Sequence, residues 1–126
     1  MRLRKPLHLL AIFLWYAVIF WFSSQADLPS QSVDWLDFFF KKSAHVGEFM
    51  ILTVLLFLYL RPHTKAVAPL AILAAFSDEI HQLFTPGRGA KLTDVLIDSI
   101  GIVIALIIMM RFYGKSRSTH HSRRNR

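Results

Sequence analysis

Ionisable side chains interrupt the apolar stretches of this chain at helical spacing. Lys41, His45 and Glu48 lie at positions i, i+4 and i+7, which places them on one face of a helix. Asp78 and Gln82 are four residues apart in the next apolar stretch. A histidine beside carboxylates can transfer protons or ligate a metal ion, and a lysine can bind an anion. Because charged groups inside an apolar helix are costly, these side chains are candidates for a functional site.

The last apolar stretch carries a similar polar stripe, formed by Asp94, Asp98, Gly101 and Ala105. Small residues four positions apart let another helix approach closely, so this face is expected to lie against a neighbouring helix and away from lipid. At about 1.5 Å per residue, Glu48, Asp78 and Asp98 lie roughly 7 to 10 Å below the same end of their helices. This shared depth predicts a polar pocket that opens at one face of a membrane.

Four apolar segments must position these residues. They comprise residues 7–22 (with the polar residues 23–25), 43–60, 66–84 and 92–110. A hydrocarbon core takes about 20 helical residues to cross, and each segment is close to that length. Pro69 falls in the first turn of the third segment, where its missing N–H costs little, and residues 85–89 then turn the chain. The sequence therefore predicts an all-α polytopic membrane protein, a bundle of four transmembrane helices.

Two segments near the start allow alternative interpretations. Basic residues before the first apolar segment and Ser24-Gln25-Ala26 after it are typical of a cleavable signal peptide, whereas the aromatic residues and the long apolar core favour a retained span. Residues 26–42 are expected to form a loop and an interfacial segment in which aromatic residues mix with acids. That segment would either anchor the second span or cover an external site.

The composition agrees with a membrane protein. Of the 126 residues, 54% are hydrophobic and 18% are charged, and the mean hydropathy is +0.42. Soluble domains average about 45–50% apolar and 25% charged residues, so a conventional soluble enzyme is disfavoured. The chain has no cysteine, which excludes disulfides, thiolate metal sites and cysteine nucleophiles.

The distribution of charge predicts the orientation. The two termini and the loop after the second span carry 11 of the 15 Lys and Arg residues, whereas the opposite half carries 4 of them and all 8 acids. The more positive side should be cytoplasmic, with both termini inside, and the polar cluster should then face outward. The basic tail would orient the protein and contact anionic lipid. The net charge of +7 comes from these orienting termini and this loop, so we expect no nucleic acid as a partner.

Several roles remain open for the polar cluster on residue chemistry alone. It could be a self-neutralising network that fixes the helix register, or a site for a charged head group in which Arg88 of the Pro-Gly-Arg-Gly turn grips an anion. It could also perform acid–base or metal-assisted catalysis through His45, Glu48, Asp78 and Glu79, with His81 as a further nitrogen ligand, or conduct ions. No established metalloprotease or phosphate-loop pattern is present, so we assign no cofactor and no metal.

The motifs resemble those of the VanZ-like family of small bacterial membrane proteins. The resemblance comprises Phe22-Ser23-Ser24-Gln25, Lys42-x-x-His45-x-x-Glu48-Phe49, Ser77-Asp78-Glu79-x-x-Gln82-x-Phe84-x-Pro86-Gly87-Arg88 and Asp94-Val95-x-x-Asp98-x-x-Gly101. The family is named for a protein linked to low-level resistance to teicoplanin. The resemblance implies a cell-envelope role at the outer face of the bacterial plasma membrane, and it leaves binding and catalysis both open.

We therefore expect a VanZ-like four-helix domain over residues 1–113 and a basic, disordered cytoplasmic tail over residues 114–126. The preferred function is recognition of a membrane lipid or a lipid-linked or lipophilic wall-associated molecule, with lowered susceptibility to lipoglycopeptides such as teicoplanin. The alternative is a membrane enzyme, metal-assisted or not, that acts on envelope lipid intermediates. The oligomeric state is left open. The expected ligand-binding residues are Lys42, His45, Glu48, Asp78, Glu79, Gln82, Arg88, Asp94 and Asp98.

Overall fold

The described part of the chain is helical almost throughout. The computed structural model describes residues 4–25, 35–61 and 63–122, with side chains for 5–25, 35–36, 38–61 and 63–113. Within them lie helices α1 (Arg4–Ser23), α2 (Trp35–Tyr59), α3 (Val67–Gln82) and α4 (Leu92–Ser122), and a 3₁₀ turn η1 (Thr64–Ala66) precedes α3. The prediction of an all-α bundle of four helices is confirmed.

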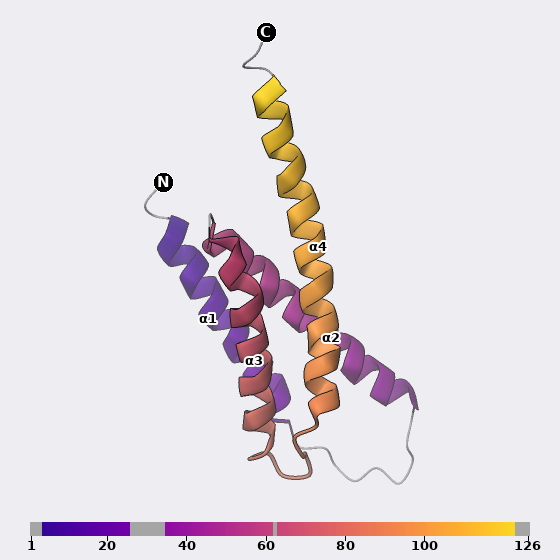
Figure 1. Ribbon diagram of the computed structural model, residues 1–126. Coiled ribbons are helices and arrows are strands. Elements are labelled where there is room, and N and C mark those ends of the chain that lie inside the picture. Colours follow the sequence, from indigo (N-terminus) through magenta and orange to yellow (C-terminus); the bar gives the residue numbers. More distant parts are fainter. Residues whose placement is uncertain (1–3, 26–34, 62, 123–126) are drawn as a thin grey trace.

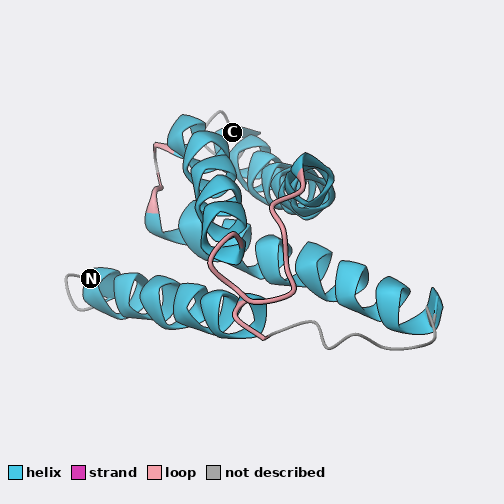
Figure 2. Ribbon diagram, turned by 90° about the horizontal axis from the view of Figure 1, so that it is seen from below, coloured by secondary structure: helices cyan, strands magenta, loops and turns pink. Residues whose placement is uncertain are grey.

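Helix α2 is the central element of the bundle. It crosses obliquely behind the other helices and contacts each of them, most extensively α4 (Figures 1 and 2). The end of α1, the start of α2 and the α3–α4 connection lie towards one end of the bundle, and the start of α1, the end of α2 and the start of α3 lie towards the other (Figure 1). Successive helices thus run in alternating directions.

The lengths and surfaces of the helices suit a membrane. Three helices are long and apolar enough to cross one, over Lys5–Ser23, Phe38–Tyr59 and Leu92–Tyr113. Helix α3 has 16 residues and is shorter, and η1 extends it towards the α2–α3 connection. Large apolar side chains such as Leu14, Leu73 and Leu96 are about 60% exposed, which suits an outer surface in contact with acyl chains. The chain is therefore a polytopic membrane protein.

Small and apolar side chains hold the helices together. Ile19, Phe49 and Leu52 are buried in one cluster with Ala71 and Ala75, whose short side chains let α3 lie close to its neighbours. Gly101 of α4 lies directly on the backbone of α2 at Val46, and Ala105 is fully buried. The expected close approach along the Gly101–Ala105 stripe is thus confirmed.

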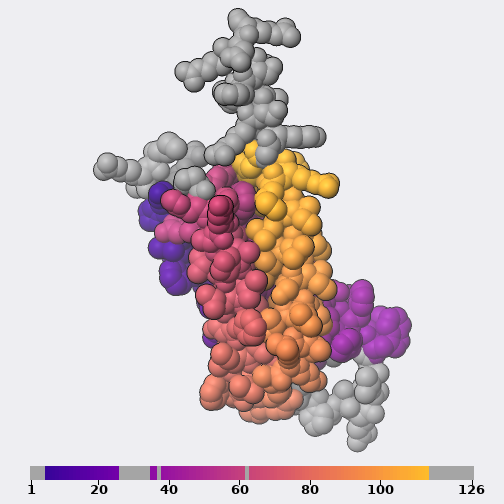
Figure 3. All heavy atoms as spheres, viewed as in Figure 1, coloured from indigo at the N-terminus to yellow at the C-terminus, as the bar shows by residue number. Residues whose placement is uncertain are grey.

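Two helix boundaries differ from the sequence expectation. Helix α2 begins at Trp35, so residues 35–42 continue the second span as helix, and these first turns project from the bundle (Figures 1 and 3). Pro29 lies upstream, and no proline or glycine interrupts the chain between Trp35 and Lys42. The exposed Trp35 and Phe38 to Phe40 suit an anchoring role and do not line the pocket described below. The rest of the presumed interfacial segment, residues 26–34, lies outside the described residues.

Helix α4 continues well beyond the expected end of the fourth span. The sequence favoured an end at Met110 and an unstructured tail from Gly114, whereas α4 runs to Ser122. No proline follows Leu92, and Gly114 alone is a weak helix breaker, so nothing in the covalent chain ends the helix earlier. The boundary between a membrane domain and a cytoplasmic tail at this point stays a prediction.

Candidate polar binding site

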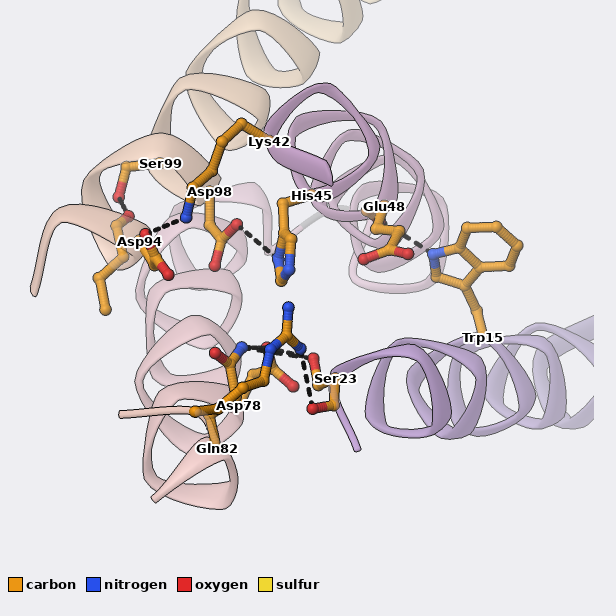
Figure 4. Close-up of polar contacts among 12 residues, drawn as sticks. Trp15, Ser23, Lys42, His45, Glu48, Asp78, Gln82, Asp94, Asp98 and Ser99 are labelled. Carbon is orange, nitrogen blue, oxygen red and sulfur yellow. Dashed lines mark hydrogen bonds and ion pairs between the residues drawn. The ribbon is translucent and has the colours of Figure 1, made fainter. Parts of the chain in front are cut away.

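Three ionisable side chains from three helices meet inside the bundle. His45 of α2, Asp78 of α3 and Asp98 of α4 each offer one ligand atom, and these atoms lie within 4.8 Å of one another. His45 Nδ1 is 3.3 Å from Asp98 Oδ1, and Asp78 and Asp98 are both almost completely buried. Figure 4 shows the His45 ring beside the Asp98 carboxylate, with Asp78 below it in the view. We call this set the His45–Asp78–Asp98 cluster.

Asp78 is fixed by hydrogen bonds from two other side chains. Its Oδ2 accepts a hydrogen bond from Ser23 Oγ at 2.7 Å and another from Gln82 Nε2 at 3.0 Å. Ser23 is the last residue of α1 and is fully buried, so this contact ties α1 to α3 beside the cluster (Figure 4). The other carboxylate oxygen, Oδ1, is buried and accepts no hydrogen bond from the described residues.

A tight turn brings Arg88 back to the end of α1. The backbone N–H of Arg88 donates to the Thr85 carbonyl at 3.1 Å, and Gly87 has φ 77°. Proline followed by a glycine of positive φ is the signature of a type II turn, since only glycine adopts that conformation without steric cost. From this turn Arg88 Nη1 donates to the Ser23 carbonyl at 2.9 Å. The Pro86-Gly87 pair therefore positions the guanidinium next to the cluster.

Two further contacts lie on the side of the α3–α4 connection. Lys42 of α2 forms an ion pair with Asp94 in the first turn of α4. Glu79 of α3 accepts a hydrogen bond from the backbone N–H of Lys91. Both carboxylates are therefore used to fix the start of α4, which separates them from the central cluster.

A pocket of about 250 Å³ lies between the C-terminal end of α1, the N-terminal half of α2 and the α3–α4 turn. Its lining consists of Phe22, Gln25, Lys41, Ala44, His45, Glu48 and Arg88. His45 lines this pocket and also belongs to the His45–Asp78–Asp98 cluster. The pocket thus has a charged lining with an aromatic ring beside it, as a site for the head group of an amphiphile would.

The structure brings the predicted site residues together in three groups. His45, Asp78 and Asp98, with Gln82 on Asp78, form the centre; Lys42, Asp94 and Glu79 lie at the start of α4; Glu48 and Arg88 line the pocket. His81, whose role the sequence left open, stacks on Phe20 of α1 with ring centroids 4.4 Å apart, outside the metal-compatible cluster. Whether these residues bind a ligand stays a prediction.

The sequence did not single out the contribution of α1. Ser23 holds Asp78 and Arg88 through its hydroxyl and carbonyl groups, and Trp15 Nε1 donates to the Glu48 carbonyl at 2.9 Å. These contacts make α1 a structural part of the site. The signals for Ser23 were the polar pair that ends the first apolar segment and the Phe22-Ser23-Ser24-Gln25 motif of the family resemblance.

The arrangement allows three kinds of chemistry. The cationic groups beside the pocket can bind an anion. The His45–Asp98 contact can orient an imidazole for proton transfer. The nitrogen and oxygen atoms of the His45–Asp78–Asp98 cluster suit a divalent transition metal. All three rely on the same few side chains at one end of the bundle.

These features define a polytopic helical membrane protein with a buried polar cluster towards one end of its helix bundle. The profile of the VanZ/LLP1 family matches residues 8–113, which include α2, α3 and most of α1 and α4. The chain belongs to this family, and the resemblance inferred from its motifs is confirmed. No curated protein and no solved structure shows significant similarity to the chain.

Proposed function

We propose that the protein binds the anionic head group of a membrane lipid or of a lipid-linked or lipophilic wall-associated molecule at the outer face of the bacterial plasma membrane. The main support for this proposal is the set of residues that line the pocket. Lys41 and Arg88 are cationic and His45 can become so, while Glu48 is the one acid among the seven lining residues. A guanidinium and an amine beside one small pocket favour a phosphate or carboxylate ligand.

The position of the pocket suits an amphiphile. Phe22 and Ala44 add apolar surface to the charged lining, and the neighbouring surface of α1 exposes large apolar side chains such as Trp21. A head group could therefore occupy the polar region while its hydrocarbon chain remains in the acyl layer. The distribution of Lys and Arg supports an outside location for this end of the bundle, where it would meet wall-associated molecules.

Binding of lipids to the purified protein in nanodiscs tests this function. The probes are a polyprenyl diphosphate and, as the zwitterionic comparison, phosphatidylcholine, with bound lipid measured by native mass spectrometry. We expect Arg88→Ala to weaken binding of the diphosphate by about 10- to 150-fold, because a charge-assisted hydrogen bond contributes about 1.5–3 kcal/mol. Lys65→Ala removes an exposed lysine at the opposite end and is the matched control.

Lys41→Gln separates loss of binding from loss of folding. Lys41 is an exposed lining residue, so its neutralisation should preserve the bundle and still weaken binding of the diphosphate. Equal binding of both lipids by the wild type, or unchanged binding in both pocket variants, would exclude the proposed head-group site.

A second candidate function is a membrane enzyme that acts on envelope lipid intermediates. The observation in its favour is the contact of His45 with the buried Asp98 next to the pocket, which could hold an imidazole for general acid–base catalysis. Release of phosphate from the same polyprenyl diphosphate distinguishes the two functions, since a binding protein returns the lipid unchanged.

A further inference from the structure

From the His45–Asp78–Asp98 cluster we infer a binding site for one divalent transition-metal ion, Zn²⁺ or Mn²⁺, between α2, α3 and α4. The sequence assigned no metal, because the spacing of single helices shows no metal motif. The helix packing supplies what the spacing lacked: three potential ligand atoms from three helices lie within 4.8 Å of one another. Head-group binding does not require this ion, so the metal site and the head-group site can be disproved independently.

The geometry is close to that of a coordinated ion. Nitrogen and oxygen ligands lie about 2.0–2.2 Å from a tetrahedral ion, which places them about 3.3–3.6 Å apart. His45 Nδ1 and Asp98 Oδ1 are already 3.3 Å apart. The Asp78 ligand atom lies within 4.8 Å of both, so it would move closer to them when an ion binds.

Unpartnered buried atoms are the second, independent observation. Asp78 is fully buried and Asp98 is 1% exposed. Among the described residues, Asp78 Oδ1 has no hydrogen-bond partner, and His45 Nδ1 and Asp98 Oδ1 have no partner beyond their mutual 3.3 Å contact. Buried polar atoms are normally satisfied, and buried charges are paired or coordinate metals. A bound cation would satisfy all three atoms at once.

The surroundings already orient one of these ligands. Ser23 and Gln82 donate to Asp78 Oδ2 and leave Oδ1 available to the cluster. Such hydrogen bonds to the outer atom of a ligand are a regular feature of metal sites, and their loss lowers metal affinity by about 10–100-fold. One imidazole with two carboxylates suits zinc or manganese better than magnesium, which prefers oxygen ligands alone.

Metal analysis of the purified full chain tests the inference. The wild type is incubated with Zn²⁺ or Mn²⁺, freed of excess ion and measured by mass spectrometry of the metal; we expect one ion for each chain. Asp98→Asn and His45→Ala should lower the affinity at least about tenfold, and Ser23→Ala should lower it by about 10–100-fold. Ser99→Ala is the matched control, since Ser99 is next to Asp98 on the same helix and its hydroxyl donates to the Val95 carbonyl of that helix.

A thermal shift of the wild type keeps the test decisive even where a variant fails to fold. A ligand that binds only the native state raises its melting temperature, so Zn²⁺ or Mn²⁺ should raise it and a chelator should reverse the rise. Absence of stoichiometric metal and of any shift in the wild type would overturn the site and identify the cluster as a network neutralised by the protein itself. Equal affinity in Asp98→Asn and the wild type would overturn it as well.

Discussion

Gly101 of α4 lies against the carbonyl group of Val46 in α2 so closely that no side chain fits between the two helices. A Cβ at position 101 would overlap the Val46 oxygen and would lie 3.2 Å from the Met50 backbone nitrogen. Both obstacles are backbone atoms, which cannot rotate away. Since His45 and Asp98 lie on either side of this interface, one glycine fixes the distance between α2 and α4 on which the polar cluster depends.

Gly101→Ala should therefore destabilise the bundle although alanine favours helix. Overpacking of a tight interface costs about 1–3 kcal/mol, more than the gain in helix propensity. The measurement is the midpoint of thermal unfolding in detergent, followed by circular dichroism. Gly47→Ala is the matched control, because nothing lies within 4 Å of a Cβ at that glycine. A melting temperature for Gly101→Ala at or above that of Gly47→Ala would contradict the role of this contact.

Ser23→Ala should loosen α1 from the rest of the molecule. The Ser23 hydroxyl donates to the buried Asp78 carboxylate, and removal of a donor from a buried acceptor costs about 1–3 kcal/mol. Ser24→Ala is the control, since Ser24 is exposed and its hydroxyl bonds only within its own helix turn, to the Trp21 carbonyl.

The two serine variants are compared by thermal unfolding and by limited proteolysis after residue 25. We expect only Ser23→Ala to melt earlier and to be cleaved faster. Similar behaviour of both variants would show that the Ser23–Asp78 contact does not hold α1 in place.

The polar periodicity of the sequence was sufficient to assign the helix faces, whereas the exact composition of the cluster depended on tertiary packing. Spacing at i and i+4 fixes which side of one helix is polar, so His45, Asp78 and Asp98 were predictable as site residues. Which acid contacts His45 depends on helix tilt and separation. The spacing in the sequence therefore did not distinguish Glu48 from Asp98 as its partner. Ser23 is a single polar residue at a helix end, and no periodicity shows which neighbour it faces.

The start of α2 was missed for a related reason. Aromatic and acidic residues at positions 35–40 occur both in interfacial segments and in the first turns of a transmembrane helix. Local composition does not distinguish these alternatives. The structure distinguishes them, because it shows one continuous helix from Trp35 to Tyr59.

The absence of cysteine makes the orientation directly testable. We expect Gly89→Cys, in the α3–α4 connection, to react with a membrane-impermeant thiol reagent in intact cells. Lys65→Cys, in η1 at the other end of the bundle, should react only after the membrane is made permeable. Both positions are exposed, and a Cβ at Gly89 meets nothing within 4 Å. The reverse pattern of labelling would place the pocket in the cytoplasm and would remove the basis for an envelope ligand.

Resistance is the most specific consequence of an outward-facing head-group site. Expression of the wild type in a susceptible strain should raise the inhibitory concentration of teicoplanin, and Arg88→Ala should abolish the rise. The reason is that Arg88 supplies the positive charge held in place by the Pro86-Gly87 turn and the Ser23 carbonyl. Lys65→Ala, expressed to the same level, should protect as the wild type does. If Arg88→Ala protects equally well while remaining folded in the membrane, then protection does not pass through the pocket, and the polar cluster must serve the bundle in another way.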